Sequence, residues 1–453
     1  MTLLGPLFAP EEIRAVFSDR ACLQGMLDFE AALARAEARV GVIPRKAAGA
    51  IAACCKAERL DADAIAAAAP NGGNLAIPLV KQLTSLVAKE NAAAARFVHW
   101  GATSQDAIDT GLVLQLRAAL PLIEADLNRL SSALAVLAKK HRKTTQVGRT
   151  WLQQALPVTF GLKAAGWLDG VERQRARLAG LKDRLLVVQF GGAAGTLAAL
   201  GPDGLKVAAA LAKELKLGLP EMPWHGQRDR FAEAATVFGL IVGSMGKIAR
   251  DVSLLMQTEI GEVLEPAGEG RGGSSTMPHK RNPVSCAAVL AAASRAPGLV
   301  ATMLGVMAPE HERGLGGWQA EWVALPELAL LAGGAACAMA ETMDGLEVNA
   351  GRMAENLART QGLILAEAVQ MALGPRIGRG VAHALIEKAS RKAVAEGKPL
   401  RDVLAADQEV TRYLKPAEIE RLLDPKHYLG QAGALVDRVL AARKSAIFVG
   451  RPH

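Results

Sequence analysis

The chain has 453 residues, of which 51% are hydrophobic but only 4% aromatic, and its 53 Lys and Arg against 45 Asp and Glu give a formal charge of +8. This length exceeds what one hydrophobic core serves, so two or three domains are expected. The basic residues form neither a long run nor a stripe with aromatic residues, which argues against nucleic acid as a partner. The excess charge serves either solubility or a cationic site for a small polyanion.

The cysteines and apolar runs predict a cytoplasmic protein without a membrane partner. The five cysteines are odd in number and show no paired metal spacing, as expected of a reduced intracellular protein. The N-terminus, MTLLGPLFAPEEIRAVF, lacks a basic segment followed by a long apolar one, so it does not predict a secretory signal. The apolar runs 234–246 and 328–340 are shorter than the roughly 20 residues that a membrane span needs.

The first hundred residues predict helices of ordinary length separated by polar turns. The clearest helix covers 19–40, with Ser18 or Asp19 as its N-cap. Gly41 and Pro44 then end it. The other segments expected here are one or two alanine-rich helices over 45–69, a turn at 70–74 and a helix over 78–95.

The polar stretch FVHWGATSQDAIDT, residues 97–110, is expected to lie between helices, and we place the first domain boundary after it. Five long helical patterns follow, at 111–141, 157–188, 228–262, 284–308 and 318–345. Several exceed the roughly 25 residues of ordinary helices, which indicates a bundle. In the third pattern, helical spacing relates Phe231, Ala234, Phe238, Ile241, Val242 and Met245. Polar residues are sparse around them, and a helix that is apolar on all sides is buried on all sides, so we expect subunits to associate.

The patterns become shorter after about residue 350, where Gly-Pro pairs and basic loops interrupt them. Alanine and leucine provide most of the apolar content, which favours helices over sheets. The sequence therefore predicts an all-α chain of three helical domains. These are an N-terminal domain over 1–110, a central long-helix bundle over 111–350 and a C-terminal domain over 351–453.

The stretch GRGGSSTMPHKRNPVSC, residues 270–286, is a polar loop between two apolar helical segments. Taken piece by piece it would be a solvated turn. The whole string resembles the signature G-S-S-x-M-P-x-K-x-N-P of the fumarase/aspartase superfamily. The matching residues are Gly273, Ser274, Ser275, Met277, Pro278, Lys280, Asn282 and Pro283. The part MPHKRNP is most similar to the branch that contains the adenylosuccinate lyases and the 3-carboxy-cis,cis-muconate cycloisomerases.

This resemblance implies an all-α, three-domain subunit whose central five-helix bundle joins three others into a homotetramer with a twenty-helix core. It implies no metal and no organic cofactor. In this superfamily a proton is removed next to a carboxylate, and a group then leaves the neighbouring carbon. By resemblance Ser274 is the base, as an alkoxide that nearby N–H groups and Lys280 stabilise. Lys280 and Asn282 would hold the carboxylate that carries the enediolate charge, with Ser275 and Met277 also at the substrate.

Two further polar stretches match the family. HWGATSQD resembles its H-x-G-x-T-S-x-D region, which places Thr103 and Ser104 at a substrate carboxylate, with His99, also expected to bind substrate, and Gln105 nearby. Thr-Ser-Gln-Asp is also a good helix start. QVGRTWLQQALPVTFG resembles G-R-T-H-x-Q-x-x-x-P-x-T-x-G, from which the expected substrate contacts are Arg149, Thr150, Trp151 and Gln154 (or Gln153). Trp151 stands where the family has its acid histidine, and Ala287 stands where adenylosuccinate lyases carry that histidine's glutamate partner.

The segments 226–235 and 308–322 resemble the family's Q-R-D-R and H-E-R regions. They offer Arg228, His311, Glu312 and Arg313, either as substrate contacts or as an ordinary network of ion pairs between helices. Of these, Arg313 is the one we assign to the substrate. His141 is interpreted as a cap or core residue and not as a ligand.

Trp151 indicates the reaction type, because an indole does not exchange a proton at ordinary pH. An amine or hydroxide leaving group needs protonation, whereas a carboxylate, with a pKa of about 4, does not. The sequence therefore predicts lactonisation of a muconate-like tricarboxylate, with Ser274 delivering the proton. The alternatives are a true C–N or C–O lyase with an acid from elsewhere, and a non-catalytic structural protein like the crystallins of this superfamily.

Overall fold

A computed structural model describes residues 3–268, 272–273, 277 and 280–449, with side chains described as far as residue 444. It is 71% helix and 5% strand, which confirms the predicted helical class. The chain divides into two compact units. Unit 1 comprises Met1–Asn128, Arg173–Lys247 and Ala287–Met339, and unit 2 comprises Arg129–Glu172, Ile248–Cys286 and Ala340–His453. The three-domain division stays a prediction.

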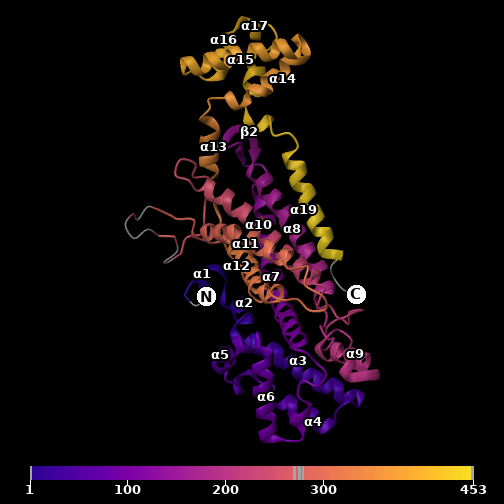
Figure 1. Ribbon diagram of the computed structural model, residues 1–453. Helices are drawn as coiled ribbons and strands as arrows, with labels where there is room; N and C mark the ends of the chain where they lie inside the picture. Colours follow the sequence, from indigo (N-terminus) through magenta and orange to yellow (C-terminus); the bar gives the residue numbers. More distant parts are fainter. Residues whose placement is uncertain (1–2, 269–271, 274–276, 278–279, 450–453) are drawn as a thin grey trace. The chain divides into compact units, whose positions relative to one another are not determined.

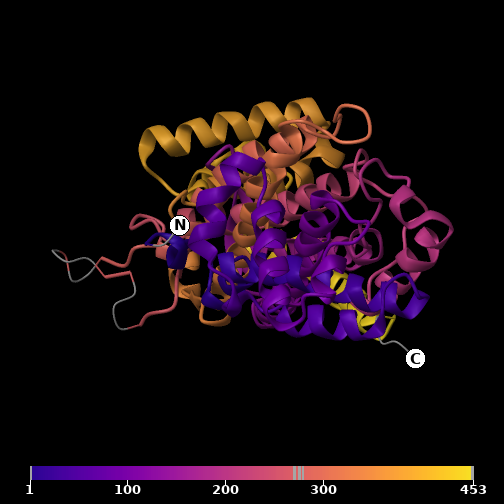
Figure 2. The same ribbon diagram turned by 60° about the horizontal axis from the view of Figure 1, so that its bottom comes forward.

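The N-terminal helices of unit 1 begin with two short ones that the sequence did not predict, and the others follow the predicted order. They are α1 (Gly5–Phe8), α2 (Glu11–Val16), α3 (Asp19–Val40), α4 (Arg45–Cys54), α5 (Ala62–Gly72) and α6 (Ala76–Glu90). The Ser18 hydroxyl accepts a hydrogen bond from the Ala21 N–H, and Gly41 ends α3 with φ of 96°, as predicted. Figures 1 and 2 show α3, α4 and α6 packed beside one another in indigo and purple.

Two boundaries in this region differ from the prediction. The turn expected at 70–74 is the last turn of α5, which continues through Pro70 and ends at Gly73 with φ of 69°. A proline removes only one backbone hydrogen bond, and the alanines before it favour helix. The stretch expected to be non-helical up to residue 110 already becomes helical at Ser104, because Asp106 caps the start by accepting the Thr103 N–H at 3.0 Å.

The five predicted long helices are confirmed. They are α7 (Ser104–Lys140), α8 (Phe160–Leu185), α10 (Asp229–Leu255), α11 (Val284–Gly305) and α12 (Gly317–Asp344). All six apolar positions that the spacing marked in α10 are buried. The predicted end of this helix at 262 is wrong. The chain leaves the helix after Leu255 and turns at Gly261, whose φ is 57°.

Three of these helices, α10, α11 and α12, are by length and composition apolar enough to cross a membrane. The apolar runs 234–246 and 328–340 marked in the sequence are shorter than α10 and α12, because the apolar character of these helices extends past each run. The structure buries 61% of the apolar window of α10 and 67% of that of α12, but only 22% of that of α11. A large apolar surface on α11 is therefore left uncovered by this chain.

Strands, which the sequence did not predict, occur in unit 2. Strands β1 (Thr145–Thr150) and β2 (Gln153–Thr159) form an antiparallel hairpin with Thr150 opposite Gln153, so residues 157–159 are strand and not helix. Strands β3 (Val263–Leu264) and β4 (Glu347–Val348) form a second antiparallel pair. The hairpin packs against helix α13 (Ala350–Ala358), as Figure 1 shows.

The remaining helices are shorter, as predicted for the C-terminal part. They are α9 (Gly204–Leu215) in unit 1, and α14 (Ala366–Ile377), α15 (Arg379–Glu396), α16 (Leu400–Ala406), α17 (Gln408–Thr411), α18 (Pro416–Leu422) and α19 (Ala432–Val449) in unit 2. The 3₁₀ helices are Ala57–Arg59, Ala94–Phe97, Ala198–Asp203, Leu363–Leu365 and Pro425–His427. Apolar side chains of α14, α15, α16 and α18 form one buried core.

Candidate active site

In unit 1, Thr103 and Ser104 stand at the N-terminus of α7, a helix of 37 residues. Arg313 reaches this helix end: its Nη1 donates to the Thr103 hydroxyl at 2.7 Å and its Nε donates to Gln105 Oε1 at 3.3 Å. The guanidinium also lies over the Trp318 ring, 5.9 Å from its centroid. A helix N-terminus with a cation held beside it favours a carboxylate. The structure thus brings three predicted substrate residues together.

His99 lies in the same unit, shortly before α7. Its backbone is left-handed, with φ of 57°, a conformation that non-glycine residues seldom adopt. Its Nδ1 lies 2.5 Å from Oε1 of Glu30, a fully buried carboxylate on α3. Burial by itself would lower the pKa of His99, but the charge and hydrogen bond of Glu30, with the Asp106 charge, raise it. His99 therefore stays protonated to a higher pH than an ordinary histidine.

Arg228 belongs to a buried ion-pair network. Its guanidinium binds Asp109 through Nη1 at 2.7 Å and Nη2 at 3.1 Å, and Glu321 through Nε at 3.0 Å. Burial would lower its pKa, but these two carboxylates raise it. The indole N–H of Trp318 also donates to Asp109, at 2.9 Å. Arg228 is only 2% exposed, so of the two roles left open by the sequence the geometry favours the network.

His311 and His141, the other two histidines considered in the sequence, lie in different environments. His311 is exposed and has a left-handed backbone with φ of 48°. His141 is buried edge-on against Phe160, and burial lowers its pKa. Its Nδ1 lies 3.2 Å from the Thr144 hydroxyl, and its Nε2 has no partner among the described residues. This environment fits the core role predicted for His141.

In unit 2, Arg149 extends from β1 to Glu262, which follows the turn after α10. Nη1 and Nη2 of Arg149 bind the two Glu262 oxygens at 3.1 and 2.7 Å. Gln146 and Asn356 also donate to this fully buried carboxylate, each at 2.7 Å. Both terminal nitrogens of Arg149 are thus engaged within the protein, and a direct contact of Arg149 with substrate stays a prediction.

Trp151 and Leu152 form the tip of the β1–β2 hairpin. Both have left-handed backbones, with φ of 52° and 63°, which is the geometry of a type I′ turn. Such turns favour asparagine and glycine, and here two bulky apolar residues occupy them. Trp151 is 98% exposed and the neighbouring Thr150 is also exposed, whereas Gln154 has a buried Oε1 without a described partner. Within a single chain Trp151 is therefore open to solvent, and its contact with substrate stays a prediction.

The signature loop is described only in part, since Ser274 and Ser275 lie outside the described residues. Its base is a short antiparallel bridge between Gly273 and Arg281, and the Asn282 N–H donates to Gly272 O at 2.8 Å. The Lys280 N–H donates to Met277 O at 3.0 Å, and both of these side chains are exposed. The bridge fixes the positions from which Lys280 and Asn282 extend.

Acidic residues that sequence reasoning missed hold this loop. Arg281 binds Glu347 of β4 at 2.9 and 3.0 Å. Glu265 accepts the N–H groups of Ser285 and Cys286 at the start of α11, at 3.2 and 2.9 Å. Glu262 and Glu265 both belong to the segment GEVLEP. Two carboxylates three residues apart, with an apolar pair between them, were the one sequence feature that could have pointed to them. The sequence did not indicate their partners, which come from distant segments.

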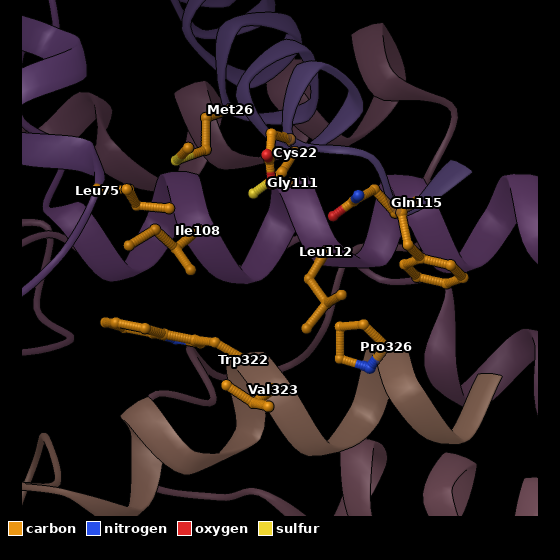
Figure 3. Close-up of a pocket in the computed structure, with 12 residues that line it drawn as sticks. Cys22, Met26, Leu75, Ile108, Gly111, Leu112, Gln115, Trp322, Val323 and Pro326 are labelled. Atoms are coloured by element: carbon orange, nitrogen blue, oxygen red, sulfur yellow. The ribbon is translucent and has the colours of Figure 1, made fainter. Parts of the chain in front are cut away.

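Unit 1 also contains a cavity of about 340 Å³ between α3, α7 and α12 (Figure 3). Met26, Ile108, Leu112 and Trp322 line it, and Asp19 is the one charged residue of its lining. An apolar cavity without a lysine or arginine does not suit a substrate with several carboxylates. We therefore do not assign the cavity to the site. Among the described residues, no cluster of three or more His, Cys, Asp or Glu side chains is placed to hold a metal ion.

Comparison with known proteins matches residues 9–298 to the family model described as lyase, and residues 362–439 to that of the adenylosuccinate lyase C-terminus. The chain belongs to the fumarase/aspartase family of lyases. It is 59% identical over 451 residues to the 3-carboxy-cis,cis-muconate cycloisomerase of Pseudomonas aeruginosa, covering 100% of this chain and 98% of that protein.

A solved structure and a lyase are also similar over the full length. The crystal structure of the 3-carboxy-cis,cis-muconate lactonizing enzyme of Pseudomonas putida matches with a TM-score of 0.93 and 54% identity, covering 98% of this chain and 99% of that one. The nitrosuccinate lyase of Streptomyces davaonensis is 46% identical, covering 100% of this chain and 96% of that protein. Homologues of this chain therefore include lactonizing cycloisomerases and an enzyme named nitrosuccinate lyase.

Proposed function

We propose that this chain is a 3-carboxy-cis,cis-muconate cycloisomerase, which forms 4-carboxymuconolactone in the protocatechuate branch of the β-ketoadipate pathway. The observation that carries the proposal is its 59% identity, over its full length, to the Pseudomonas aeruginosa enzyme of that name. The fold agrees, with a TM-score of 0.93 to a lactonizing enzyme. The lyase signature loop and the anion-binding start of α7 supply the groups that such a substrate needs.

The reaction is an internal addition. One substrate carboxylate oxygen forms a C–O bond to a carbon of the conjugated diene. The π electrons move toward the carbon beside another carboxylate, which becomes an enediolate. Ser274 delivers its proton to that carbon, and the enediolate returns to a carboxylate. The addition consumes one proton, which solvent returns to the Ser274 alkoxide after each turnover, and Lys280 with Asn282 stabilises the enediolate charge.

Two separate groups of residues bind the carboxylates of the substrate. In our proposal Arg313 and the α7 N-terminus, with Thr103 and Ser104, bind one carboxylate. Lys280 and Asn282 bind the carboxylate that becomes the enediolate. Arg149 positions the hairpin through Glu262, so that Thr150, Trp151 and Gln154 face the substrate. Met277 and Ser275 complete the set.

A histidine acid is not required in this reaction, because the group that adds is a carboxylate, a weak base. That agrees with tryptophan at position 151 and alanine at position 287. A second candidate, favoured by the identity to nitrosuccinate lyase, is elimination of another weakly basic group such as nitrite from a succinate-type substrate. Both reactions use the same base and anion-binding groups and differ in whether a fragment is released.

We also propose that four chains associate into a cytoplasmic homotetramer. Two observations support it: the apolar window of α11 is only 22% buried within one chain, and Trp151 is 98% exposed in a turn that bulky residues disfavour. Burial against other copies would remove both exposures.

The test is an ultraviolet assay of the purified protein with 3-carboxy-cis,cis-muconate, nitrosuccinate and adenylosuccinate in parallel. We expect rapid loss of the muconate absorbance and slow or no reaction of the other two. Turnover of nitrosuccinate or adenylosuccinate alone would replace the proposal with a lyase. Absence of turnover on all three would favour a structural protein. The Ser274→Ala variant, which should lose activity by orders of magnitude, controls for contaminating enzyme.

A further inference from the structure

Glu30 is a buried carboxylate on α3. It lies among Leu27, Phe29, Ala31 and Ala34, all of which are buried, and is itself only 1% exposed. Its Oε2 has no hydrogen-bond partner among the described residues, and its Oε1 meets His99 Nδ1 at 2.5 Å. A buried charge is costly unless it is paired, and the His99 imidazole is the partner of Glu30 among the described residues.

Two buried groups near Glu30, the Glu37 carboxyl and the Cys55 thiol, have raised pKa values. Glu37 lies two turns further along α3, fully buried, and neither of its carboxylate oxygens has a partner among the described residues. Burial, and then the charge of Glu30, raise the pKa of Glu37 to about 9. Burial and Glu30 also raise the pKa of Cys55. The raised pKa keeps Glu37 protonated at neutral pH, and Asp106 on α7 is a second carboxylate near His99.

Both the backbone conformation of His99 and the contact of its ring with Glu30 fix the position of this side chain. The left-handed backbone at φ of 57° fixes the direction in which its side chain leaves the chain. With Nδ1 donating to Glu30, the tautomer and rotation of the ring are set. The side chain is 17% exposed, so the ring is not sealed in the core. In the protonated ring, Nε2 is then a second N–H donor that carries positive charge.

We propose that Glu30 is a positioning residue, which holds His99 as an imidazolium so that its Nε2–H binds one carboxylate of the substrate. The substrate contact rests on the proposed function and on the assignment of His99 to the site; the pairing itself does not. This gives unit 1 a second cation beside Arg313, and it gives the chain a His–Glu pair at a position different from the lost histidine of residue 151. A merely structural Glu30 would change stability but not the titration of His99.

The first experiment is independent of turnover. The eight histidines are titrated by NMR in wild type, in Glu30→Gln and in Glu37→Gln, and His99 is assigned by its loss in His99→Asn. Glutamine keeps an acceptor for Nδ1–H but removes the charge. We expect the His99 midpoint to fall by about one pH unit or more in Glu30→Gln and to stay unchanged in Glu37→Gln, the matched variant on the same helix. An unchanged midpoint in Glu30→Gln overturns the pairing. If Glu30→Gln does not fold, Glu30→Asp is used, in which the shorter carboxylate should give a smaller fall.

The second experiment tests the substrate contact with 3-carboxy-cis,cis-muconate. Removal of a charge-assisted hydrogen bond should raise KM about tenfold, with little change in kcat, at a pH between the His99 midpoints that the first experiment measures in the two proteins. At a pH below both midpoints, where His99 is protonated in both proteins, the KM values should converge. Glu30→Asp should restore much of the affinity at the higher of these pH values. A KM that is insensitive to Glu30→Gln at both pH values, in a protein whose His99 midpoint has fallen, overturns the substrate contact. Loss of turnover in wild type would instead contradict the proposed function, and the titration would still decide the pairing.

Discussion

Trp151 occupies the tip of the β1–β2 hairpin, at the position where the family carries its acid histidine. The tryptophan cannot donate a proton in the ordinary pH range. The same side chain is 98% exposed in one chain, where an apolar ring gains nothing from folding. At the residue scale, the chemistry of lactonisation and the burial expected in an assembly together account for this unusual residue.

We predict that Trp151→His will not accelerate lactonisation. The reacting carboxylate needs no acid, and a smaller polar ring would leave more water beside the alkene, so kcat/KM should fall. The measurement is kcat/KM of wild type and variant across pH. Because Ala287 leaves the new histidine without a carboxylate partner, no lyase activity should arise. A faster variant with a new ionisation near pH 6.5, the usual pKa of histidine, would show that an acid is needed.

Glu37 makes stability depend on pH. Its pKa is about 9 in the fold, against 4.5 in the unfolded chain, because burial and then Glu30 disfavour its charge. Between these values the folded state holds a proton that the unfolded state has lost, so the free energy of unfolding falls as pH rises, by up to about 1.4 kcal/mol per pH unit. Below the lower value this effect disappears.

We therefore expect Glu37→Gln to stabilise the protein progressively from pH 5 to pH 8, since glutamine carries no ionisable proton. The measurement is the difference in Tm between wild type and variant at the two pH values. Glu233→Gln, which changes an exposed carboxylate that is paired with Arg184, should show no such trend. Equal Tm differences at both pH values would show that Glu37 is ionised in the fold.

At the scale of elements, the sequence predicted what depends on local spacing and missed what depends on distant partners. The long helices follow from apolar residues at helical intervals, and all six positions marked in α10 are buried. The hairpin was missed because its strands are short and its turn contains Trp151 and Leu152 in place of the usual asparagine and glycine. The start of α7 was placed at 111, although Thr-Ser-Gln-Asp is a good helix start, because Asp106 caps the helix from inside the polar motif.

The candidate site shows the same division. Thr103 and Arg313, which belong to two motifs far apart in sequence, are in contact, while their shared role at the substrate stays a prediction. Glu30 and Glu262 were not predicted. Their partners, His99 and Arg149, are separated from them by 69 and 113 residues in sequence, and no local pattern connects them.

Gly272 offers a direct test of the loop base. Its φ is 68°, and a Cβ there would lie 2.8 Å from Asn282 O, the partner strand of the bridge. Gly272→Ala should therefore displace Asn282 and lower kcat/KM at least about tenfold while the helices stay folded. Gly273→Ala is the matched control, since its Cβ would meet no described atom within 4 Å. Equal activity of the two variants would show that the bridge does not position the catalytic residues.

For the whole molecule, the uncovered surface of α11 indicates self-association. A chain of 47.4 kDa should elute as a tetramer of about 190 kDa, four times that mass, in size exclusion with light scattering. Leu304→Glu places a charge on the exposed side of α11 and should shift the protein toward smaller species. Val381→Glu changes a comparably exposed apolar residue on α15 and should leave the mass unchanged. A stable monomer of wild type at micromolar concentration would contradict the assembly.

The central step of the proposed reaction is the addition of a carboxylate across a double bond, with one proton delivered from Ser274. The most direct measurement is an NMR and mass analysis of the product formed from 3-carboxy-cis,cis-muconate in D₂O. We predict a single lactone that carries one deuterium beside a carboxylate, with no small fragment released. The Ser274→Ala variant should give no product. Release of a fragment from the substrate, a lactone without deuterium, or normal product from Ser274→Ala would contradict the proposed reaction.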